Sequence, residues 1–274
     1  INTTGAVSVT GAIGTDIGTI TITNSGGTTF GGVVNVNTAI AITATTGTVA
    51  FNAAVSSPTL SIASGSYNVA LNATGTNITN HVTFNNTGTL ALGSSGGTQT
   101  YAGGLTATGP SATTLKGTIN STNAPMTFGP ITLAANSVIS TNATDAAADL
   151  VIGAVTGAGY SLTLSTGGVT GADVSGTSVS NTSYLILQDI GGSTSFGGSI
   201  TTAYLTVANT VNDLSLTGSS GTITNEVTFA NTGSLSLGAT AGTQTYSGGV
   251  VATSPSAITL AGTLVFGANT TLGD

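Results

Sequence analysis

The chain contains 274 residues, of which 39% are hydrophobic and only 3% are charged, and its formal net charge is −7 with a single Lys or Arg residue. Nucleic acid recognition requires several cationic side chains against the phosphates, so this composition excludes it, and it argues equally against anionic membranes and phosphorylated ligands. The sequence has no cysteine and no apolar run of about 20 residues, which excludes disulfides, thiolate metal sites and a membrane-inserted helix.

Strand-like runs follow one another along the whole chain. Thr occurs 57 times and Gly 41 times, a composition that favours β-strands and tight turns over helices. Most runs alternate apolar and polar residues, and this period of two places one side of the strand in a core and the other in water. In chain order, the expected strands are 19–23, 39–43, 59–63, 68–71, 89–92, 161–164, 184–187, 204–207 and 234–237.

The chain repeats itself on two scales. Residues 78–119 and 223–264 align at an offset of 145 with 28 of 42 positions identical. A finer shift of 21 residues brings Phe30 onto Phe51. A sandwich or barrel would also be all-β with regular turns, but a short period inside a longer duplication indicates a solenoid in which each repeat is one coil. We therefore predict an all-β fold, a parallel β-helix of about 13 coils of about 21 residues.

The duplication also predicts the domain organisation. We expect a single continuous β-solenoid over residues 1–274, built from two tandem copies of about 145 residues, at about 1–128 and 146–274. The stretch near 129–149 is the least regular, and its Ala-rich end, with Asp145 and Asp149, predicts a loop or a short helix that leaves the coil.

The two ends of the chain resemble the two parts of the connector. Residues 264–274 resemble 126–136, and residues 3–14 resemble 148–159, so that joining the ends would nearly continue the repeat. Unpaired strand edges at the end of a solenoid are templates for further pairing. We therefore expect the chain to be a window of a longer array or to pair with itself, with the Ile1 end against the Asp274 end.

Aromatic and threonine side chains provide the candidate surface sites. Stacked coils predict that the recurrent aromatic residues form inward ladders, since buried aromatic side chains dominate core energetics. Tyr101 and Tyr246 share the motif TQTYxGG, and we expect them to be the surface pair because a Tyr hydroxyl requires water or a partner. The candidate ligand contacts are Tyr101, Tyr246, Thr98, Thr100, Thr243 and Thr245, and regularly spaced Thr pairs on a flat face would suit ice or carbohydrate.

Catalytic residues are scarce. His81 is replaced by Glu226 in the second copy and Lys116 by Ala261, so neither belongs to the duplicated design. A polysaccharide-degrading β-helix would need converging carboxylates. We therefore expect no enzymatic activity and no catalytic or cofactor-binding residues.

Calcium is the one metal that the sequence suggests, at two places. Residues 167–174 resemble a glycine-rich calcium-binding nonapeptide with one residue too many before Asp173, and the pattern occurs once rather than in tandem. Asp145 and Asp149 could share a cation with backbone carbonyls. A solvated loop is the alternative at both places.

Several coil phrases, among them GTVAFNAAV, TTFGGVVNVNT and TLALGSSGGTQTYAGGLTAT, resemble the coils of filamentous-haemagglutinin-type exoproteins and related bacterial surface adhesins. This resemblance implies a right-handed parallel β-helix that is secreted to the bacterial cell surface as a rigid stalk, fibre or adhesive shaft. Host or matrix glycans are then the expected partners besides the chain itself. The alternative function is an ice- or carbohydrate-binding solenoid module.

Overall fold

The computed structural model of the chain describes residues 1–273, and these residues contain no helix. About 55% of the chain is strand, arranged in parallel as a β-solenoid of about 13 turns about 21 residues apart, so the predicted fold class is confirmed. None of the described residues forms a helix long and apolar enough to cross a membrane. The chain divides into two compact units, Ile1–Ile131 and Thr132–Asp274.

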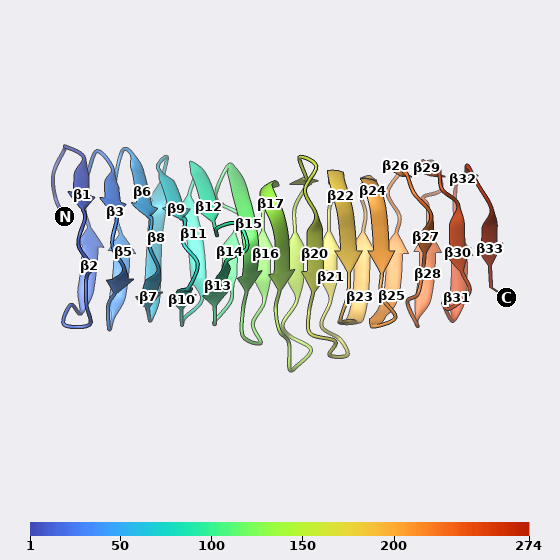
Figure 1. Cartoon of the computed structure of the whole chain (residues 1–274), viewed down its shortest axis with the longest axis horizontal. Coiled ribbons are helices and arrows are strands. Elements are labelled where there is room, and N and C mark those ends of the chain that lie inside the picture. The colour runs from blue at the N-terminus through green and yellow to red at the C-terminus, as the bar shows by residue number, and fades with distance from the viewer. Residues whose placement is uncertain (274) are drawn as a thin grey trace. The chain divides into compact units, whose positions relative to one another are not determined.

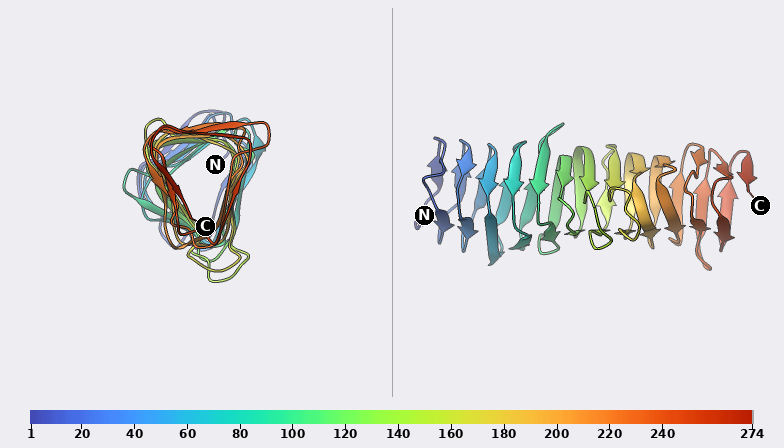
Figure 2. Two further views of the ribbon diagram at one scale, coloured as in Figure 1. Left: turned by 90° about the vertical axis from the view of Figure 1, so that its right-hand side faces the viewer. Right: turned by 90° about the horizontal axis from the view of Figure 1, so that it is seen from below.

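Three sides enclose the interior of the first unit, and we name them faces A, B and C (Figures 1 and 2). Face A comprises β1 (Val7–Val9), β3 (Thr28–Phe30), β6 (Thr48–Phe51), β9 (Asn68–Leu71), β12 (Thr89–Leu92) and the start of β15 (Ala112–Asn120). Face B comprises β4 (Val34–Asn35), β7 (Val55–Ser57), β10 (Thr76–Ile78), β13 (Thr98–Tyr101) and the end of β15. Face C comprises β2 (Thr19–Ile22), β5 (Ala39–Ile42), β8 (Thr59–Gly65), β11 (Val82–Asn86), β14 (Leu105–Ala107) and β16 (Met126–Phe128).

The second unit has the same three faces, named by their correspondence in the repeat. Face A comprises β18 (Leu150–Ile152), β21 (Val174–Gly176), β23 (Ile190–Phe196), β25 (Val211–Leu216), β28 (Ser234–Leu237) and β31 (Ala257–Leu260). Face B comprises β19 (Val155–Thr156), the starts of β22 (Val179–Leu187) and β24 (Ile200–Val207), β26 (Ser220–Ile223), β29 (Thr243–Tyr246) and β32 (Thr263–Phe266). Face C comprises the end of β17 (Ile131–Ser140), β20 (Leu162–Ser165), the ends of β22 and β24, β27 (Val227–Thr228), β30 (Val250–Ala252) and β33 (Thr270–Leu272).

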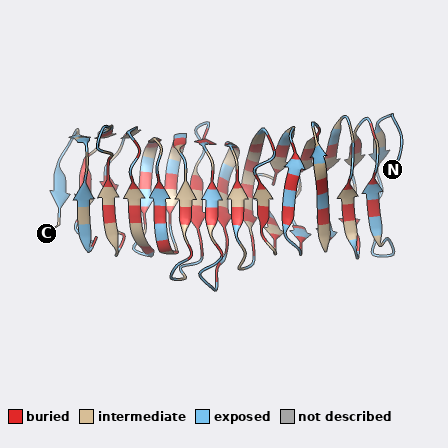
Figure 3. Cartoon of the chain, turned by 180° about the vertical axis from the view of Figure 1, so that it is seen from behind, coloured by how far each residue is buried: buried red, intermediate tan, exposed pale blue. Residues whose placement is uncertain are grey.

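Like residues stack on one another in the interior. Phe30 pairs with Phe51 in the ladder, and their rings lie parallel with centroids 4.8 Å apart, which is the spacing between paired strands. Buried and exposed residues alternate along the strands (Figure 3), as a period of two requires. The predicted inward aromatics that are buried are Phe30, Phe51, Phe84, Tyr101, Phe128, Phe196, Phe229 and Tyr246, whereas Phe266, on the last strand of face B, is partly exposed.

Each coil needs residues that turn the corner between faces. Gly93 ends β12 with φ +86°, and a Cβ atom there would overlap the carbonyl oxygen of Lys116 on the next coil. Its equivalent Gly238 has φ +84° and faces the carbonyl oxygen of Ala261 in the same way. Because both the backbone conformation and the close approach require the absence of a side chain, glycine is fixed at this corner in both units.

The connector is more regular than the sequence indicated. Strand β17 occupies Ile131–Ser140, and of the predicted connector only residues 129–130 and 141–149 are without a strand, so the irregular part is a loop and contains no helix. The loop over residues 166–173 on the following coil packs against it, with Ala143, Ala148 and Ala172 buried together beside Val169. The Ala-rich and Gly-rich stretches therefore form a small core of their own outside the main solenoid interior.

Candidate functional site

Tyr101 is buried, with 0% of its surface exposed, so its prediction as a surface residue is wrong. Its hydroxyl donates to Oε1 of Gln99 at 3.0 Å, and Nε2 of Gln99 donates to the carbonyl oxygens of Leu71 (2.7 Å) and Ala73 (2.8 Å) on the preceding coil. The partner that the hydroxyl requires is a glutamine two residues earlier on the same inward side of the strand. The Leu71 carbonyl oxygen also accepts from the amide of Gly93, so the glutamine adds a second hydrogen bond there and supplies a donor to the Ala73 carbonyl at the corner of the coil.

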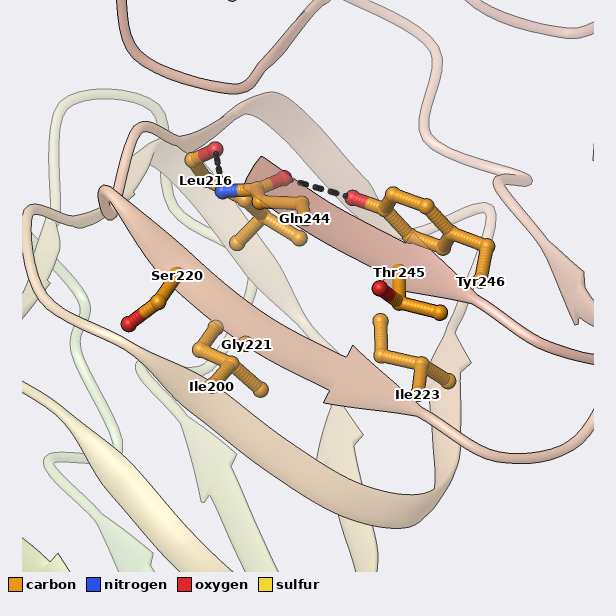
Figure 4. A pocket seen from close by; sticks show the side chains of 8 residues that line it. All are labelled: Ile200, Leu216, Ser220, Gly221, Ile223, Gln244, Thr245 and Tyr246. Atoms are coloured by element: carbon orange, nitrogen blue, oxygen red, sulfur yellow. Dashed lines mark hydrogen bonds between the residues drawn. The ribbon is translucent and has the colours of Figure 1, made fainter. Parts of the chain in front are cut away.

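The second unit repeats this network, and the surface prediction is wrong for Tyr246 as well. Tyr246 is 2% exposed and donates to Oε1 of Gln244 at 3.0 Å (Figure 4). Gln244 donates through Nε2 to the carbonyl oxygens of Leu216 (2.8 Å) and Gly218 (2.9 Å). The duplicated motif TQTYxGG is therefore part of the interior, and its conservation between the copies reflects hydrogen bonding inside the coil.

Burial changes the acidity of these tyrosines. Burial raises the pKa of Tyr101 and Tyr246 above the ordinary value of 10.0, because the phenolate would lose its hydration. Tyr67, buried in the first unit with its hydroxyl donating to the carbonyl oxygen of Ala63, has its pKa raised to about 12 for the same reason. All three side chains therefore remain neutral hydrogen-bond donors at ordinary pH.

A small cavity lies beside the Gln244–Tyr246 network and is lined also by Ile200, Leu216 and Ile223 (Figure 4). Its volume is about 10 Å³. A cavity needs roughly 10–15 Å³ to hold one water molecule. This cavity is therefore a packing gap in the core and has no room for an organic ligand.

The candidate threonines do lie on the outside, on face B. Thr98 and Thr243 are exposed, and Thr100 and Thr245 are partly exposed. Thr243 and Thr245 of the second unit each belong to a column of hydroxyl side chains that runs across three successive coils. The ladder pairs form the columns Ser220–Thr243–Thr263 and Thr201–Thr222–Thr245. In the first unit, Asn77 and Asn120 flank Thr100, so a regular array of Thr side chains is confined to the second unit.

The acidic residues of face A act as hydrogen-bond acceptors for the backbone. Asp149 Oδ1 accepts from the amide of Asp173 (2.9 Å), and Asp173 Oδ1 accepts from the amide of Ser193 (2.7 Å). Asp145 Oδ1 accepts from the amide of Ala147 within the connector loop. Within residues 1–273, no three His, Cys, Asp or Glu side chains gather where they could hold a metal ion. Each of the predicted calcium-binding acids thus has a structural partner.

His81 lies on the surface of face C and bridges two coils. Its Nδ1 lies 3.1 Å from the carbonyl oxygen of Gly103, and its Nε2 lies 3.1 Å from Oγ1 of Thr106. In the second unit the equivalent positions hold Glu226 and Val251, and the exposed Glu226 carboxylate makes no hydrogen bond with the described residues. The same place in the coil is therefore occupied by a bridging side chain in one unit and by an unbonded carboxylate in the other.

An exposed aromatic stack, which was not among the sequence predictions, lies on face C of the second unit. Tyr184 and Tyr204 pair in the ladder between β22 and β24, each is 40% exposed, and their rings are stacked with centroids 4.5 Å apart and planes at 10°. The phrases YLIL and YLTV, 20 residues apart, contain the signal, since alternation buries the leucines and turns both tyrosines outward.

A surface pocket of about 260 Å³ adjoins this stack and is lined by Tyr204, Leu205, Thr206, Val207, Glu226, Thr228 and Ala230. The pocket lies where face C is interrupted, because β27, β30 and β33 form a separate three-stranded sheet that is not paired with β24. Pairing resumes only at the single bridge between Val207 and Phe229. We call this pocket the face C slot.

Comparisons with protein-family models, with curated proteins and with solved structures found no match to the chain. The resemblance to filamentous-haemagglutinin-type exoproteins therefore depends on the coil phrases alone. The structure supports a β-helix repeat protein, which is the fold that this resemblance implies.

Proposed function

We propose that the chain is a structural or adhesive segment of an extracellular β-solenoid at a bacterial surface, and that its work is mechanical. The observation that carries this proposal is the stacking of like residues within each unit, since backbone ladders and buried columns such as Phe30 on Phe51 join every coil to the next. Solenoids of this kind gain stability from nearest-neighbour interfaces, so a segment can be extended without a new core.

The proposal assigns no catalytic step to the chain. Asp149 and Asp173 are engaged by backbone amides at 2.9 Å and 2.7 Å, which favours a structural role for these carboxylates. Asp213 is held similarly by the amide of Ser234 at 2.6 Å. Carboxylates that complete the coil-to-coil hydrogen bonding are poor candidates for paired acid and base groups, which must converge on one bond of a substrate.

End-to-end association with a second copy is part of the proposal. Strands β31, β32 and β33 expose apolar side chains, among them Leu260 at 44% and Leu272 at 38%. The similarity of residues 264–274 to 126–136, and of 3–14 to 148–159, supports pairing of the Ile1 end with the Asp274 end. Asp274 itself lies outside the described residues.

Electron microscopy of the purified protein over a range of concentrations tests this proposal. We expect unbranched filaments that lengthen with concentration and have an axial layer spacing of about 4.8 Å. Replacement of Leu260 by Lys should shorten them, whereas Lys in place of the exposed Val151, which is away from β31–β33, should not. Particles whose length is independent of concentration and unaffected by L260K would contradict end-to-end pairing.

A second candidate function is the ordering of water at an ice surface, favoured by the two hydroxyl columns on face B of the second unit. Those columns repeat at the coil spacing, so their hydroxyls form a regular array. An ice-recrystallisation assay decides between the candidates. Inhibition that is lost in Thr243→Tyr and retained in Thr98→Tyr would support ice binding, and absence of inhibition by the unaltered protein would exclude it.

A further inference from the structure

The coil that forms the face C slot is duplicated, but several residues that line the slot differ from their equivalents in the first unit. In the first unit the equivalent strands, β8 and β11, pair at Phe84 and Ile62, which correspond to Phe229 and Val207, and they pair again at Asn86 and Gly65. In addition, Asn85 Nδ2 donates to the carbonyl oxygen of Ile62 at 3.0 Å. The second unit has Ala230 where the first has Asn85, so this hydrogen bond across the strands is absent and Ala230 lines the slot instead.

Two further replacements change the walls. Tyr204 takes the place of Thr59, whose Oγ1 accepts from Nδ2 of Asn80 in the first unit. Glu226 takes the place of His81, whose ring is held by the next coil. Together with Ala230, these changes replace three bonded polar side chains by an open aromatic face, an unbonded carboxylate and a methyl group. The structural core around them is unchanged, since Phe229 and Val207 keep the bridge.

We propose that the face C slot is a binding site for a neutral saccharide, whose pyranose ring stacks on Tyr204 and whose hydroxyl groups donate to Glu226. This inference goes beyond the mechanical function, which does not need it. It concerns one ring-sized subsite on the outer surface of the second unit.

The geometry of the stack provides the apolar half of the site. Tyr184, on the preceding coil, covers one face of the Tyr204 ring, with the centroids 4.5 Å apart. The opposite face of Tyr204 is turned toward the following coil, where the third position of the column is occupied by Glu226 rather than by another ring. A flat apolar surface of aromatic carbon is thus left open at the edge of the slot, and it can pack against the C–H face of a sugar.

The polar half of the site suits hydroxyl groups. Glu226 provides a carboxylate that accepts charge-assisted hydrogen bonds, and the hydroxyls of Thr206 and Thr228 can both donate and accept. The volume of about 260 Å³ is slightly below the roughly 300–1,000 Å³ of pockets that enclose drug-sized ligands. The slot therefore fits a ligand of one or two rings, or one unit of a longer polymer.

The negative charge of the chain and the aromatic lining of the slot argue against acidic glycans and organic cations as the ligand. The chain carries a net charge of −7 with Lys116 as its only Lys or Arg residue, and Glu226 lines the slot, so sulfated or carboxylated glycans would be repelled. A small organic cation would be attracted by Glu226, but recognition of such cations uses a cage of several rings. Only one ring face, that of Tyr204, lines this slot.

The test measures binding of four sugars to the whole chain by saturation-transfer-difference NMR. The probes are methyl β-glucopyranoside, methyl β-galactopyranoside, methyl α-mannopyranoside and N-acetylglucosamine. We expect at least one of the four to bind with a Kd in the millimolar range, around 1–10 mM, with saturation transferred to the ring C–H protons. The chain has no tryptophan, so quenching of tyrosine fluorescence is a second readout.

The units supply matched variants. Tyr204→Thr and Ala230→Asn install the residues of the first unit and should each weaken binding at least about tenfold, while the midpoint of thermal unfolding stays unchanged. Tyr160→Ala is the control, because Tyr160 is also 40% exposed but does not line the slot, and it should leave binding unchanged.

Three outcomes would overturn the proposal. They are binding of none of the four sugars up to about 50 mM, binding that Tyr204→Thr and Ala230→Asn leave unchanged, and binding of heparin or tetramethylammonium alone. Loss of sugar binding in Tyr204→Thr with unaltered filament formation would show that the site is separate from the mechanical function.

Discussion

The two units have equivalent interiors but differ on face C. The Gln99–Tyr101 network and the Gln244–Tyr246 network have the same donors, acceptors and distances within about 0.1 Å. On face C, by contrast, His81 bridges two coils in one unit while Glu226 is unbonded in the other.

This difference shows which positions the solenoid constrains. A residue inside the coil contacts equivalent residues on both neighbouring coils, so its size and hydrogen bonding must fit a column. A residue outside the coil meets water on one side and can change without disturbing the ladder. We therefore expect similar effects for matched interior substitutions where the two residues are equally buried, and unequal effects for matched substitutions on face C.

The largest effect should come from Gly93→Ala and Gly238→Ala. Each substitution forces a residue with a side chain to a φ near +85° and drives its Cβ into a carbonyl oxygen of the next coil. We expect each to cost more than about 3 kcal/mol, measured by urea unfolding of the whole chain. A loss of unfolding free energy for only one of the two substitutions would contradict the equivalence of the two interiors. Gly96→Ala, with φ +71° but open space around its Cβ, is the control that separates backbone strain from overlap.

Gln99→Leu and Gln244→Leu should have the next largest effect. Each removes two donors from backbone carbonyls and the acceptor of a buried Tyr hydroxyl, and we expect a cost of about 2–3 kcal/mol. Gln99 is 0% exposed and Gln244 is 8% exposed, so water can compensate better in the second unit and Gln99→Leu should cost more. Equal stability of Gln99→Leu and the unaltered protein would contradict the structural role of the network.

Alkaline pH should separate the two units. An unfolded tyrosine loses its proton near its ordinary pKa of 10.0, whereas burial raises the pKa of Tyr67 to about 12 and also raises the pKa of Tyr101 and Tyr246. The unfolded chain therefore binds fewer protons than the folded chain above pH 10, and stability falls as the pH rises from there through the folded pKa values.

The first unit contains two of these buried tyrosines and the second unit one, because Asn212 replaces Tyr67. Amide exchange should therefore accelerate more steeply with pH in the first unit, after correction for the intrinsic alkaline rate. Tyr67→Phe should remove the difference. An identical pH response of the two units before this substitution would contradict the prediction.

The smallest effect should follow the exchange of Asn68 and Asp213. Asn68 Oδ1 accepts from the amide of Thr89 at 2.7 Å, and Asp213 Oδ1 accepts from the amide of Ser234 at 2.6 Å. Asn68→Asp and Asp213→Asn keep that oxygen, so each should change stability by less than about 0.5 kcal/mol. Asp213→Ala, which removes it, should cost about 1–2 kcal/mol. A large effect of Asp213→Asn would indicate that the charge has a role beyond this hydrogen bond.

The sequence predicted the fold because a solenoid repeats its own core. A shift of 21 residues aligned Phe30 with Phe51, and the structure pairs them in the ladder. The surface position predicted for Tyr101 is wrong because the water or partner that its hydroxyl requires was sought outside the coil. Alternation in TQTY places Gln99 on the same inward side, and that glutamine provides the partner.

The face C slot could not be predicted from the sequence. Tyr184 and Tyr204 could have been identified as outward residues from alternation alone, but the interruption between β24 and β27 depends on how the strands pair. The loss of a cross-strand bond at Ala230 has meaning only once Asn85 is seen to donate to Ile62.

The central claim is that the interiors of the two units are equivalent. Amide hydrogen exchange of the whole chain, measured by mass spectrometry after pepsin digestion, tests this claim most directly. We predict slow and closely similar exchange for the ladder amides of β12 and β28, and of β13 and β29, with faster exchange in the second unit only around Glu226–Thr228 at the face C slot. Rapid exchange throughout one unit, or no difference between the units at face C, would contradict it.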